Sequence, residues 1–500
     1  MKELLQRIRQ KAAINPRQMA IRDELGQLDY EQLIHEVNRL SVQLKGERIG
    51  LMTDNSVAWA CLDLAIMSRG AVCVPMPNFF SADQLRHLMV DADLDEIITD
   101  QPKRLAELLG DSSSSDIRVA NHELSVFHRM PTASRPLLPA GTIKVTYTSG
   151  TTGQPKGVCL SARTLTEITR ALSDAVVAKE SDCSLSLLPL STLLENIAGV
   201  YVPLWSGALA QVPSLSSCGF AGSSGLDIGK LFANLVWSKP SSVVLVPQLL
   251  KAIVGGISAG LPMPESLRFV AVGGAPVADS LLQDARALGL PVYQGYGLSE
   301  AGSVVCLNLP GASREKSVGK PLPHLRVAVQ PDGEIIVSGP VHLGYLGAET
   351  DIRQTDWSTG DLGYLDQDGY LFLAGRKKTA YSTAFGRNVS PEWVEAALTG
   401  QYRIAQAALF GEGQPFNVAI LVPNGDVTSH ELAHAVHSVN QHLPDYARVA
   451  HWIVAKQPFT PANQLMSPSG SIQRQRVYSE YQEQIENLYF SAQEKTHAIL

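Results

Sequence analysis

The segment from Thr148 to Val158, TSGTTGQPKGV, contains the residue types that bind phosphate. It combines three glycines, four hydroxyl side chains and one lysine in eleven residues. Glycines allow backbone N–H groups to approach phosphate oxygens, hydroxyls add donors, and a lysine adds a positive charge. The segment does not fit the Walker A pattern, because Pro155 stands where that pattern requires a glycine. It therefore predicts a triphosphate-binding loop of another kind.

Two further segments follow expected strands and carry groups suited to a nucleotide. They are Gly273–Pro276, with the sequence GGAP, and Gln294–Glu300, with the sequence QGYGLSE. Ligands of open α/β sheets bind at the carboxyl ends of the strands, so we expect both segments at one site. A carboxylate such as that of Glu300 suits Mg²⁺ bridging the phosphates of ATP.

These blocks, in this order, resemble the signatures of the adenylate-forming (AMP-binding) superfamily, which includes acyl-CoA synthetases, peptide-synthetase adenylation domains and luciferases. The similarity extends from RIGLMTDNS, near residue 48, to the C-terminal helices. Within the superfamily the chain looks closest to the long-chain fatty acyl-CoA synthetases. The resemblance implies ATP, Mg²⁺ and CoA as cofactors, and activation of a small-molecule carboxylic acid as acyl-AMP before thioester formation.

The same resemblance assigns roles in nucleotide binding. Tyr296 matches the aromatic residue that packs on adenine, and Ser299 replaces the usual threonine beside phosphate. Glu300 matches the Mg²⁺ ligand, while Asp361 and Arg376 match the ribose-binding block. The catalytic candidates are Thr148, Lys156, Glu300 and Ser471, and the other nucleotide-binding candidates are Ser149, Gly150, Thr151, Thr152, Gly153, Gly274, Ala275, Pro276, Gln294, Gly295 and Gly297.

The segment Leu188–Asn196, LPLSTLLEN, indicates the nature of the acid. It resembles the LPLAHxxE block of long-chain acyl-CoA synthetases, which lies beside the carboxylate pocket. The resemblance places Thr192, Asn196 and Gly273 at the acid, with Thr192 standing where those enzymes carry a histidine. We identify no aspartate in position to receive a substrate amino group, and the neighbouring segment is apolar. A fatty or aromatic acid is therefore favoured over an amino acid.

Two departures from the family concern steps other than ATP binding. In Leu465–Arg474, which matches the family's closing block, Ser471 occupies the position of the lysine that contacts the acyl carboxylate and the α-phosphate. Losing one preorganised donor commonly costs about 3 kcal/mol, or roughly 10²-fold in rate. In Ser382–Asn388, Phe385 stands where the family has a glycine at the pantetheine tunnel, and Gly386 follows it. A side chain there would narrow or redirect the tunnel.

These features leave three functions open. The principal prediction is an AMP-forming acid–thiol ligase of the acyl-CoA synthetase type. The second is a free-standing acyl-AMP ligase that delivers to an acyl carrier protein or another nucleophile, which Phe385 favours. The third is a nucleotide-binding pseudoenzyme, which Ser471 favours.

The elements that must position these groups alternate along the chain. Short β-rich apolar runs separated by amphipathic runs predict a layered α/β fold, with a helix over 279–288 that Asp279 caps and Gly289 ends. The pattern changes at Arg376. The family resemblance then predicts a large ATP- and acyl-binding domain (1–375) and a small, mobile C-terminal α+β domain (376–500), hinged near Lys378. The expected strands are RIGLMT, AVCVPM, EIITD, IKVTYT, SSVVLVP, LRFVAVGG and PVYQGYG.

Composition restricts the partners and the location. The 500 residues carry a net charge of −7, which gives no positive excess for binding nucleic acid. The six scattered cysteines lack metal-ligand or disulfide spacing, and the N-terminus lacks a signal peptide, so a cytoplasmic protein is expected. The uncharged stretch Asn196–Leu226 contains Pro203 and Gly207 and is too interrupted to predict a transmembrane segment.

Overall fold

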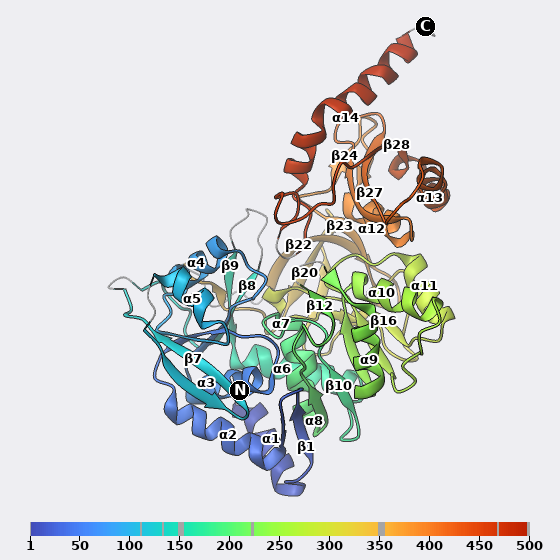
Figure 1. Ribbon diagram of the computed structural model, residues 1–500. Helices are drawn as coiled ribbons and strands as arrows, with labels where there is room; N and C mark the ends of the chain where they lie inside the picture. Colours follow the sequence, from blue (N-terminus) through green and yellow to red (C-terminus); the bar gives the residue numbers. More distant parts are fainter. Residues whose placement is uncertain are drawn as a thin grey trace.

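The computed structural model describes residues 2–110, 113–132, 135–148, 155–221, 225–348, 356–467 and 470–497. Figure 1 shows a large lower part, built from the first three quarters of the chain, and a smaller upper part from which helix α14 (Arg474–His497) projects. Within these ranges the large part contains sheets of eight, nine and four strands, and the small part a sheet of three. The predicted α/β architecture with a large and a small part is confirmed.

The eight-stranded sheet carries the strands on either side of the predicted phosphate loop. Parallel pairing joins its middle strands, whereas the strands at its two ends run antiparallel to their neighbours. Middle strands buried on both faces are typical of parallel sheets covered by helices. The order is β21 (Gly344–Tyr345), β9 (Lys156–Ser161), β8 (Thr142–Thr148), β4 (Val72–Pro75), β3 (Arg48–Met52), β5 (Glu96–Thr99), β7 (His122–His128) and β6 (Ser115–Val119).

The nine-stranded sheet carries the two predicted nucleotide segments at neighbouring strand ends. Its strands from β1 to β16 pair in parallel, in spatial order, and shorter antiparallel strands close both edges. The order is β18 (Lys320–Pro321), β17 (Cys306–Leu307), β16 (Val292–Tyr296), β15 (Phe269–Val272), β14 (Ser242–Leu245), β10 (Cys183–Leu185), β11 (Leu209–Gln211), β1 (Met19–Arg22) and β2 (Gln27–Asp29).

Helices cover these sheets, and α3 (Val57–Arg69) lies deepest among them. Ser56 caps its first turn by accepting a hydrogen bond from the Trp59 N–H, and Gly70 ends it at φ +88°. Apolar residues surround α3 on almost every side, as expected of a helix buried in a large core. The others in the large part are α1 (Lys2–Ile14), α2 (Tyr30–Gln43), α4 (Ala82–Asp91), α5 (Pro102–Leu109), α6 (Ala162–Ala175), α7 (Leu193–Glu195), the π-helix η1 (Asn196–Tyr201), α8 (Val202–Ser206), α9 (Ile228–Ser238), α10 (Pro247–Ser258), α11 (Asp279–Ala287) and the 3₁₀ turn η2 (Ser299–Ala301).

The four-stranded sheet leads the chain from the large part into the small one. Its order is β19 (Arg326–Val329), β20 (Glu334–Ser338), β22 (Asp356–Leu365) and β23 (Leu371–Arg376). Elsewhere in the large part, β12 (Phe220–Ala221) and β13 (Gly225–Leu226) form a separate pair of strands. The small part has its own two apolar clusters on either side of its sheet. Its elements are β24 (Tyr381–Ser382), β25 (Asn388–Val389), α12 (Pro391–Gly400), β26 (Ile404–Phe410), β27 (Asn417–Pro423), α13 (Ser429–His442), the 3₁₀ turn η3 (Asp445–Ala447), β28 (Val449–Val454) and α14.

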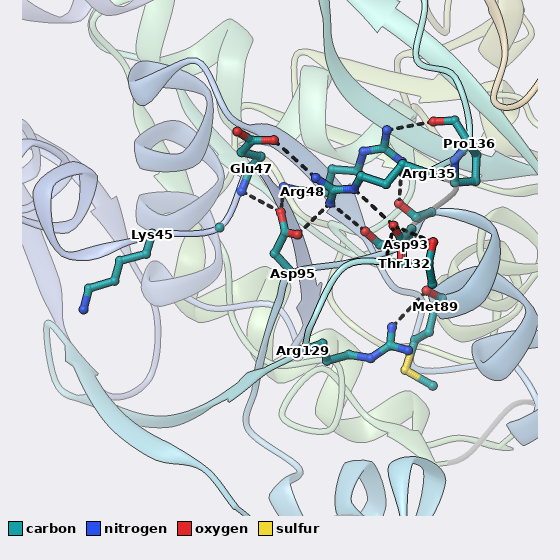
Figure 2. A network of polar contacts seen from close by, with 12 residues as sticks. Lys45, Glu47, Arg48, Met89, Asp93, Asp95, Arg129, Thr132, Arg135 and Pro136 are labelled. Atoms are coloured by element: carbon teal, nitrogen blue, oxygen red, sulfur yellow. Dashed lines mark hydrogen bonds and ion pairs between the residues drawn. The ribbon is translucent and has the colours of Figure 1, made fainter.

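A polar network fixes the chain where it approaches β8 (Figure 2). The Arg135 guanidinium lies 3.1 Å from the Asp93 carboxylate, 2.6 Å from the Asp95 carboxylate and 3.2 Å from the Glu47 carboxylate. Arg48 donates to the Pro136 carbonyl at 2.8 Å. These contacts hold Arg135 and Pro136, which precede β8, against the N-terminal ends of β3 and β5.

The expected strands all occur, and the helix predicted over 279–288 is α11. One detail was wrong: Ala278 occupies the N-cap position, and Asp279 is the first residue inside the helix. Gly289 follows the helix at φ +84°, as predicted for its end. None of the helices in the described part of the chain has the length and apolar character needed to cross a membrane.

Candidate active site

The strands β8 and β9 present the two ends of the predicted phosphate loop side by side. Thr148 pairs directly with Lys156 across this hairpin. The loop residues Ser149, Gly150, Thr151, Thr152 and Gly153 lie outside the described residues. Gly157 must lack a side chain, because an added Cβ would lie 2.8 Å from Val145 Cγ1.

Glu300, the predicted Mg²⁺ ligand, lies in η2 and is linked to the Lys156 side chain through Tyr345. The Tyr345 hydroxyl donates to Glu300 Oε1 at 2.8 Å, and Lys156 Nζ lies 5.7 Å from the centroid of the Tyr345 ring. Burial and the neighbouring carboxylate both raise the pKa of Tyr345, so this phenol remains a donor. Sequence inspection missed Tyr345.

The predicted adenine and ribose residues also come together. The Tyr296 hydroxyl donates to Asp361 Oδ2 at 2.6 Å, and Arg376 Nε lies 3.0 Å from Asp361 Oδ1. Burial raises the pKa of Asp361; the Arg376 guanidinium and the Tyr296 hydroxyl oppose this rise, and the Glu300 carboxylate adds to it. Tyr296, which lies in the strand just before η2, thus links Asp361 to the segment that carries Glu300.

Close backbone packing explains the glycines at these strand ends. A Cβ at Gly297 would lie 1.6 Å from the Ser303 carbonyl oxygen, and a Cβ at Gly273 would lie 3.0 Å from that of Gly295. Gly274 has φ +79°, a conformation that glycine adopts without strain. The remaining predicted residues nearby are Ala275 and Pro276, which are exposed, Gln294 within β16 and Ser299 at the start of η2.

The residues predicted to contact the acid have different surroundings. The Thr192 hydroxyl donates to the Pro189 carbonyl at 2.7 Å, just before α7. Asn196 is buried, with its amide oxygen 2.5 Å from Lys144 Nζ and its amide nitrogen 3.2 Å from Asp63 Oδ2. The side chain predicted to meet the acid is thus engaged inside the protein.

That inner network has Lys144 at its centre and was missed by sequence inspection. The fully buried Lys144 ammonium lies 2.7 Å from Asp63 Oδ1 and donates to the Tyr201 hydroxyl at 2.8 Å. Tyr201 in turn donates to Asp63 Oδ2 at 2.5 Å. The network joins β8 and α3 to both ends of η1, because Asn196 and Tyr201 are its first and last residues. π-helical turns often occur at functional sites.

Glu195, immediately before η1, has a carboxyl group in an apolar place. Neither carboxyl oxygen has a hydrogen-bond partner of good geometry among the described residues, and the same is true of the Ser186 hydroxyl. Burial raises the pKa of Glu195 to about 8; the nearby Ser186 side chain and the Leu188 N–H oppose this rise only in part. A Cβ at Gly199 would lie 2.5 Å from Glu195 Oε1, so this glycine makes room for the carboxyl group.

The predicted hinge follows β23 directly. Lys377 Nζ lies 2.7 Å from the Asp332 carboxylate and 2.8 Å from that of Glu334, which ties the chain to the large part. Lys378 is exposed in the turn that comes next. Gly375 lies against the start of α12, where an added Cβ would be 2.1 Å from Ser390 Oγ.

The two departures from the family pattern lie in the small part. Phe385, beside Gly386 in the turn between β24 and β25, is 76% exposed. Ser471 is exposed, and its backbone forms hydrogen bonds with Ser467. Arg474 cannot readily replace the missing lysine, because its guanidinium donates to Glu395 at 2.6 Å and to the Leu409 carbonyl at 2.9 Å.

The residues present fit Mg²⁺ that arrives with a nucleotide. Mg²⁺ in nucleotide sites usually binds through one or two carboxylates together with substrate phosphates. Within the ranges that the structure describes, no group of three or more His, Cys, Asp or Glu side chains could hold a metal ion by itself. Glu300 offers one carboxylate near Lys156, which matches the shared mode of binding.

Known relatives support the family resemblance. The model of the AMP-binding enzyme family matches residues 8–346, and that of the AMP-binding enzyme C-terminal domain matches residues 381–493. A 2-succinylbenzoate–CoA ligase of Bacillus cereus is 28% identical over 460 residues, covering 85% of this chain and 90% of the relative. The long-chain-fatty-acid–CoA ligase FadD15 of Mycobacterium bovis is 28% identical over 449 residues, covering 75% of this chain and 73% of the relative.

A solved structure shares the fold. The o-succinylbenzoate CoA synthetase MenE of Bacillus subtilis, in complex with the acyl-adenylate OSB-AMP, superposes with a TM-score of 0.75 at 22% identity, covering 94% of this chain and 97% of that chain. The predicted enzyme class, an AMP-forming acid–thiol ligase, agrees with the names of the relatives. The chain is a member of the AMP-binding enzyme family, with the adenylate-forming fold of a large N-terminal domain followed by the family's C-terminal domain.

Proposed function

We propose that this enzyme joins a fatty or aromatic acid to AMP at the expense of ATP and then passes the acyl group to CoA. One observation carries the proposal: the fold brings together Lys156 of β9, Glu300 of η2 and Asp361 of β22. Tyr345 faces Lys156 and donates to Glu300, and Tyr296, which lies in the strand just before η2, donates to Asp361. A cation and two carboxylates so placed can meet the phosphates, the metal and the ribose of a nucleotide.

Each group has a defined task in this proposal. Thr148 and Lys156 bind phosphate oxygens at the two ends of the loop, and Lys156 contributes positive charge there. Asp361 accepts hydrogen bonds from the ribose hydroxyls, with Arg376 beside it, and Tyr296 packs against adenine. Glu300 would hold Mg²⁺, which neutralises phosphate charge when bound. Such chemistry depends on positioning and electrostatics more than on covalent participation by the protein.

The acid is proposed to be a fatty or aromatic acid rather than an amino acid. Thr192 has no charge, and the segments on either side of it, Leu187–Leu190 and Leu193–Val202, are largely buried and apolar. The named relatives act on 2-succinylbenzoate and on long-chain fatty acids, which span the aromatic and aliphatic choices.

Ser471 lowers the expected rate of the first step. No positive charge is carried at this position, and Arg474 is held by Glu395. We therefore propose a working but slow adenylation, about 10²-fold slower than with a lysine.

A second acceptor is favoured by one observation. Phe385 presents an exposed aromatic ring on the turn where the resemblance places the pantetheine tunnel. Such a ring suits contact with a carrier protein better than it suits passage of free CoA. Transfer to a carrier-bound thiol is therefore the alternative second step. We also propose a cytoplasmic location, because the six cysteines lack disulfide or metal-ligand spacing.

Mass spectrometry of products tests the proposal. The protein is incubated with ATP, Mg²⁺ and a panel of fatty and aryl acids, with and without CoA. Acyl-CoA supports the full proposal. Acyl-AMP that persists in the presence of CoA supports the alternative acceptor, and a protein that binds ATP but forms neither product over long incubation contradicts both.

A further inference from the structure

Tyr345 occupies a position between the two charged groups that the proposed function assigns to phosphate and metal. It lies in β21 and pairs with Val158 of β9, the strand that begins at Lys156. Its hydroxyl donates to Glu300 Oε1 at 2.8 Å, while its ring faces the Lys156 ammonium at 5.7 Å. One side chain thus contacts groups from two different elements.

Backbone hydrogen bonds make this position rigid. Leu343 N–H donates to the Cys159 carbonyl at 2.8 Å and Leu346 N–H to the Gly157 carbonyl at 2.8 Å, one on each side of Tyr345. The segment is also tied to the metal candidate itself, because the His342 N–H donates to the Glu300 carbonyl at 2.6 Å.

Aromatic packing fixes the direction of the Tyr345 ring. The His342 ring meets the Trp357 ring edge-on at 4.4 Å, and the Tyr345 ring lies 5.3 Å from His342 and 6.0 Å from Trp357. His342 Nδ1 accepts a hydrogen bond from the Gly344 N–H at 3.0 Å, which orients the imidazole. The phenol is therefore aimed at Glu300 before any ligand arrives.

We propose that Tyr345 is a positioning residue, whose hydroxyl holds one oxygen of the Glu300 carboxylate so that the other oxygen is directed at the divalent cation of the nucleotide. The Tyr345 ring at the same time supports the Lys156 ammonium by a cation–π contact. The inference rests on the proposed function of Glu300. Partners of this kind, which orient a metal-binding carboxylate, typically change metal affinity roughly 10- to 100-fold when removed.

The test uses Tyr345→Phe, which removes the hydroxyl and keeps the ring. Mn²⁺ binding to the full-length protein is followed by electron paramagnetic resonance in the presence of a non-hydrolysable ATP analogue. We expect roughly 10- to 100-fold weaker Mn²⁺ binding than in the wild type. We also expect the Mg²⁺ concentration needed for half-maximal acyl-AMP formation to rise, with the rate restored by excess Mg²⁺. A general folding defect would not be rescued by the cation.

Tyr364→Phe is the matched control, since Tyr364 is an exposed tyrosine that stacks on Phe372 in the four-stranded sheet. Its Mn²⁺ affinity should equal that of the wild type. In a Glu300→Gln background, Tyr345→Phe should have no further effect on the affinity. Equal affinities in Tyr345→Phe and wild type would overturn the inference and leave the proposed function standing. A wild type that binds no nucleotide-dependent Mn²⁺ would overturn both.

Discussion

Lys251 of the large domain donates from Nζ to the Thr399 carbonyl of the small domain at 2.6 Å, and to the carbonyls of Gln401 and Ile404 at 3.1 Å. The Thr399 and Gln401 carbonyls lie at the end of α12, where helix carbonyls lack partners within the helix and favour a cation, and Ile404 begins β26. Gly400 allows this approach, because a Cβ there would be 2.5 Å from the Ala278 Cβ. The contact holds the small domain in the observed orientation.

Lys251→Met should loosen the end of α12. The substitution keeps much of the side-chain volume and removes hydrogen bonds from a charged group, which contribute roughly 2 kcal/mol. Hydrogen–deuterium exchange of peptides covering 396–404 should become faster than in the wild type. Lys230→Met, at an exposed lysine of α9, is the control. An unchanged exchange rate in Lys251→Met would contradict the proposal that Lys251 stabilises the end of α12.

Glu195→Gln should remove a pH dependence of stability. Burial raises the pKa of Glu195 from 4.5 to about 8, so between these values the folded protein keeps a proton that the unfolded chain releases. The contribution of this bound proton to the free energy of unfolding is fully present below about pH 4.5. It is lost as the pH rises to 8, at roughly 1.4 kcal/mol per pKa unit. The Tm of Glu195→Gln should therefore exceed that of the wild type by an amount that grows from pH 5 to pH 8. Glu123→Gln, at an exposed residue of β7, should follow the wild type at every pH.

Arg135→Ala should destabilise the large domain. The substitution leaves Asp93 and Asp95, both shielded from solvent, without their shared guanidinium partner. Both carboxylates keep hydrogen bonds from backbone N–H groups and Arg135 is partly exposed, so the cost should be roughly 2 kcal/mol, the value of hydrogen bonds to a charged group. The Tm of the large domain should fall by several degrees. Arg163→Ala, at an exposed arginine of α6, should leave this Tm unchanged. A transition unaltered by Arg135→Ala would show that the network in Figure 2 adds little to stability.

Ser471→Lys should accelerate acyl-AMP formation. A lysine would supply the donor that the family places at this position, and one preorganised donor changes such rates by roughly 10²-fold. Pyrophosphate release measured with saturating ATP reports the step. Ser479→Lys adds the same charge at an exposed position of α14 and should have no effect. Equal rates in wild type and Ser471→Lys would mean that another group already fills the role.

Local patterns predicted the sheet strands, because a strand depends on residues close in sequence. The nucleotide site was assigned from the motifs of the family and stays a prediction. Alternating apolar runs gave the strands, and glycines marked strand ends where backbones meet. The pairing of Tyr296 with Asp361 joins residues that motif matching had already placed in one site, although the sequence did not predict their direct hydrogen bond.

Contacts between distant segments escaped prediction. Asn196 was assigned to the acid from its motif, but its amide reaches Lys144 and Asp63, which are far away in the sequence. One signal was present, since a lysine in the middle of the apolar strand IKVTYT must find a partner if it is buried. Tyr345 gave no comparable signal, because its contacts with Glu300 and Lys156 arise only when β21 pairs with β9.

The ion pairs of Lys377 make the mobility of the small domain depend on ionic strength. Its pairs with Asp332 and Glu334 involve a half-exposed ammonium, and dissolved salt weakens ion pairs between side chains that are in contact with solvent. The hydrogen bonds from Lys251 to backbone carbonyls are more sheltered. Added salt would therefore break the ion pairs of Lys377 before it breaks the hydrogen bonds between Lys251 and the end of α12. The segment that joins the two domains would become mobile first, while α12 stays in contact with the large domain.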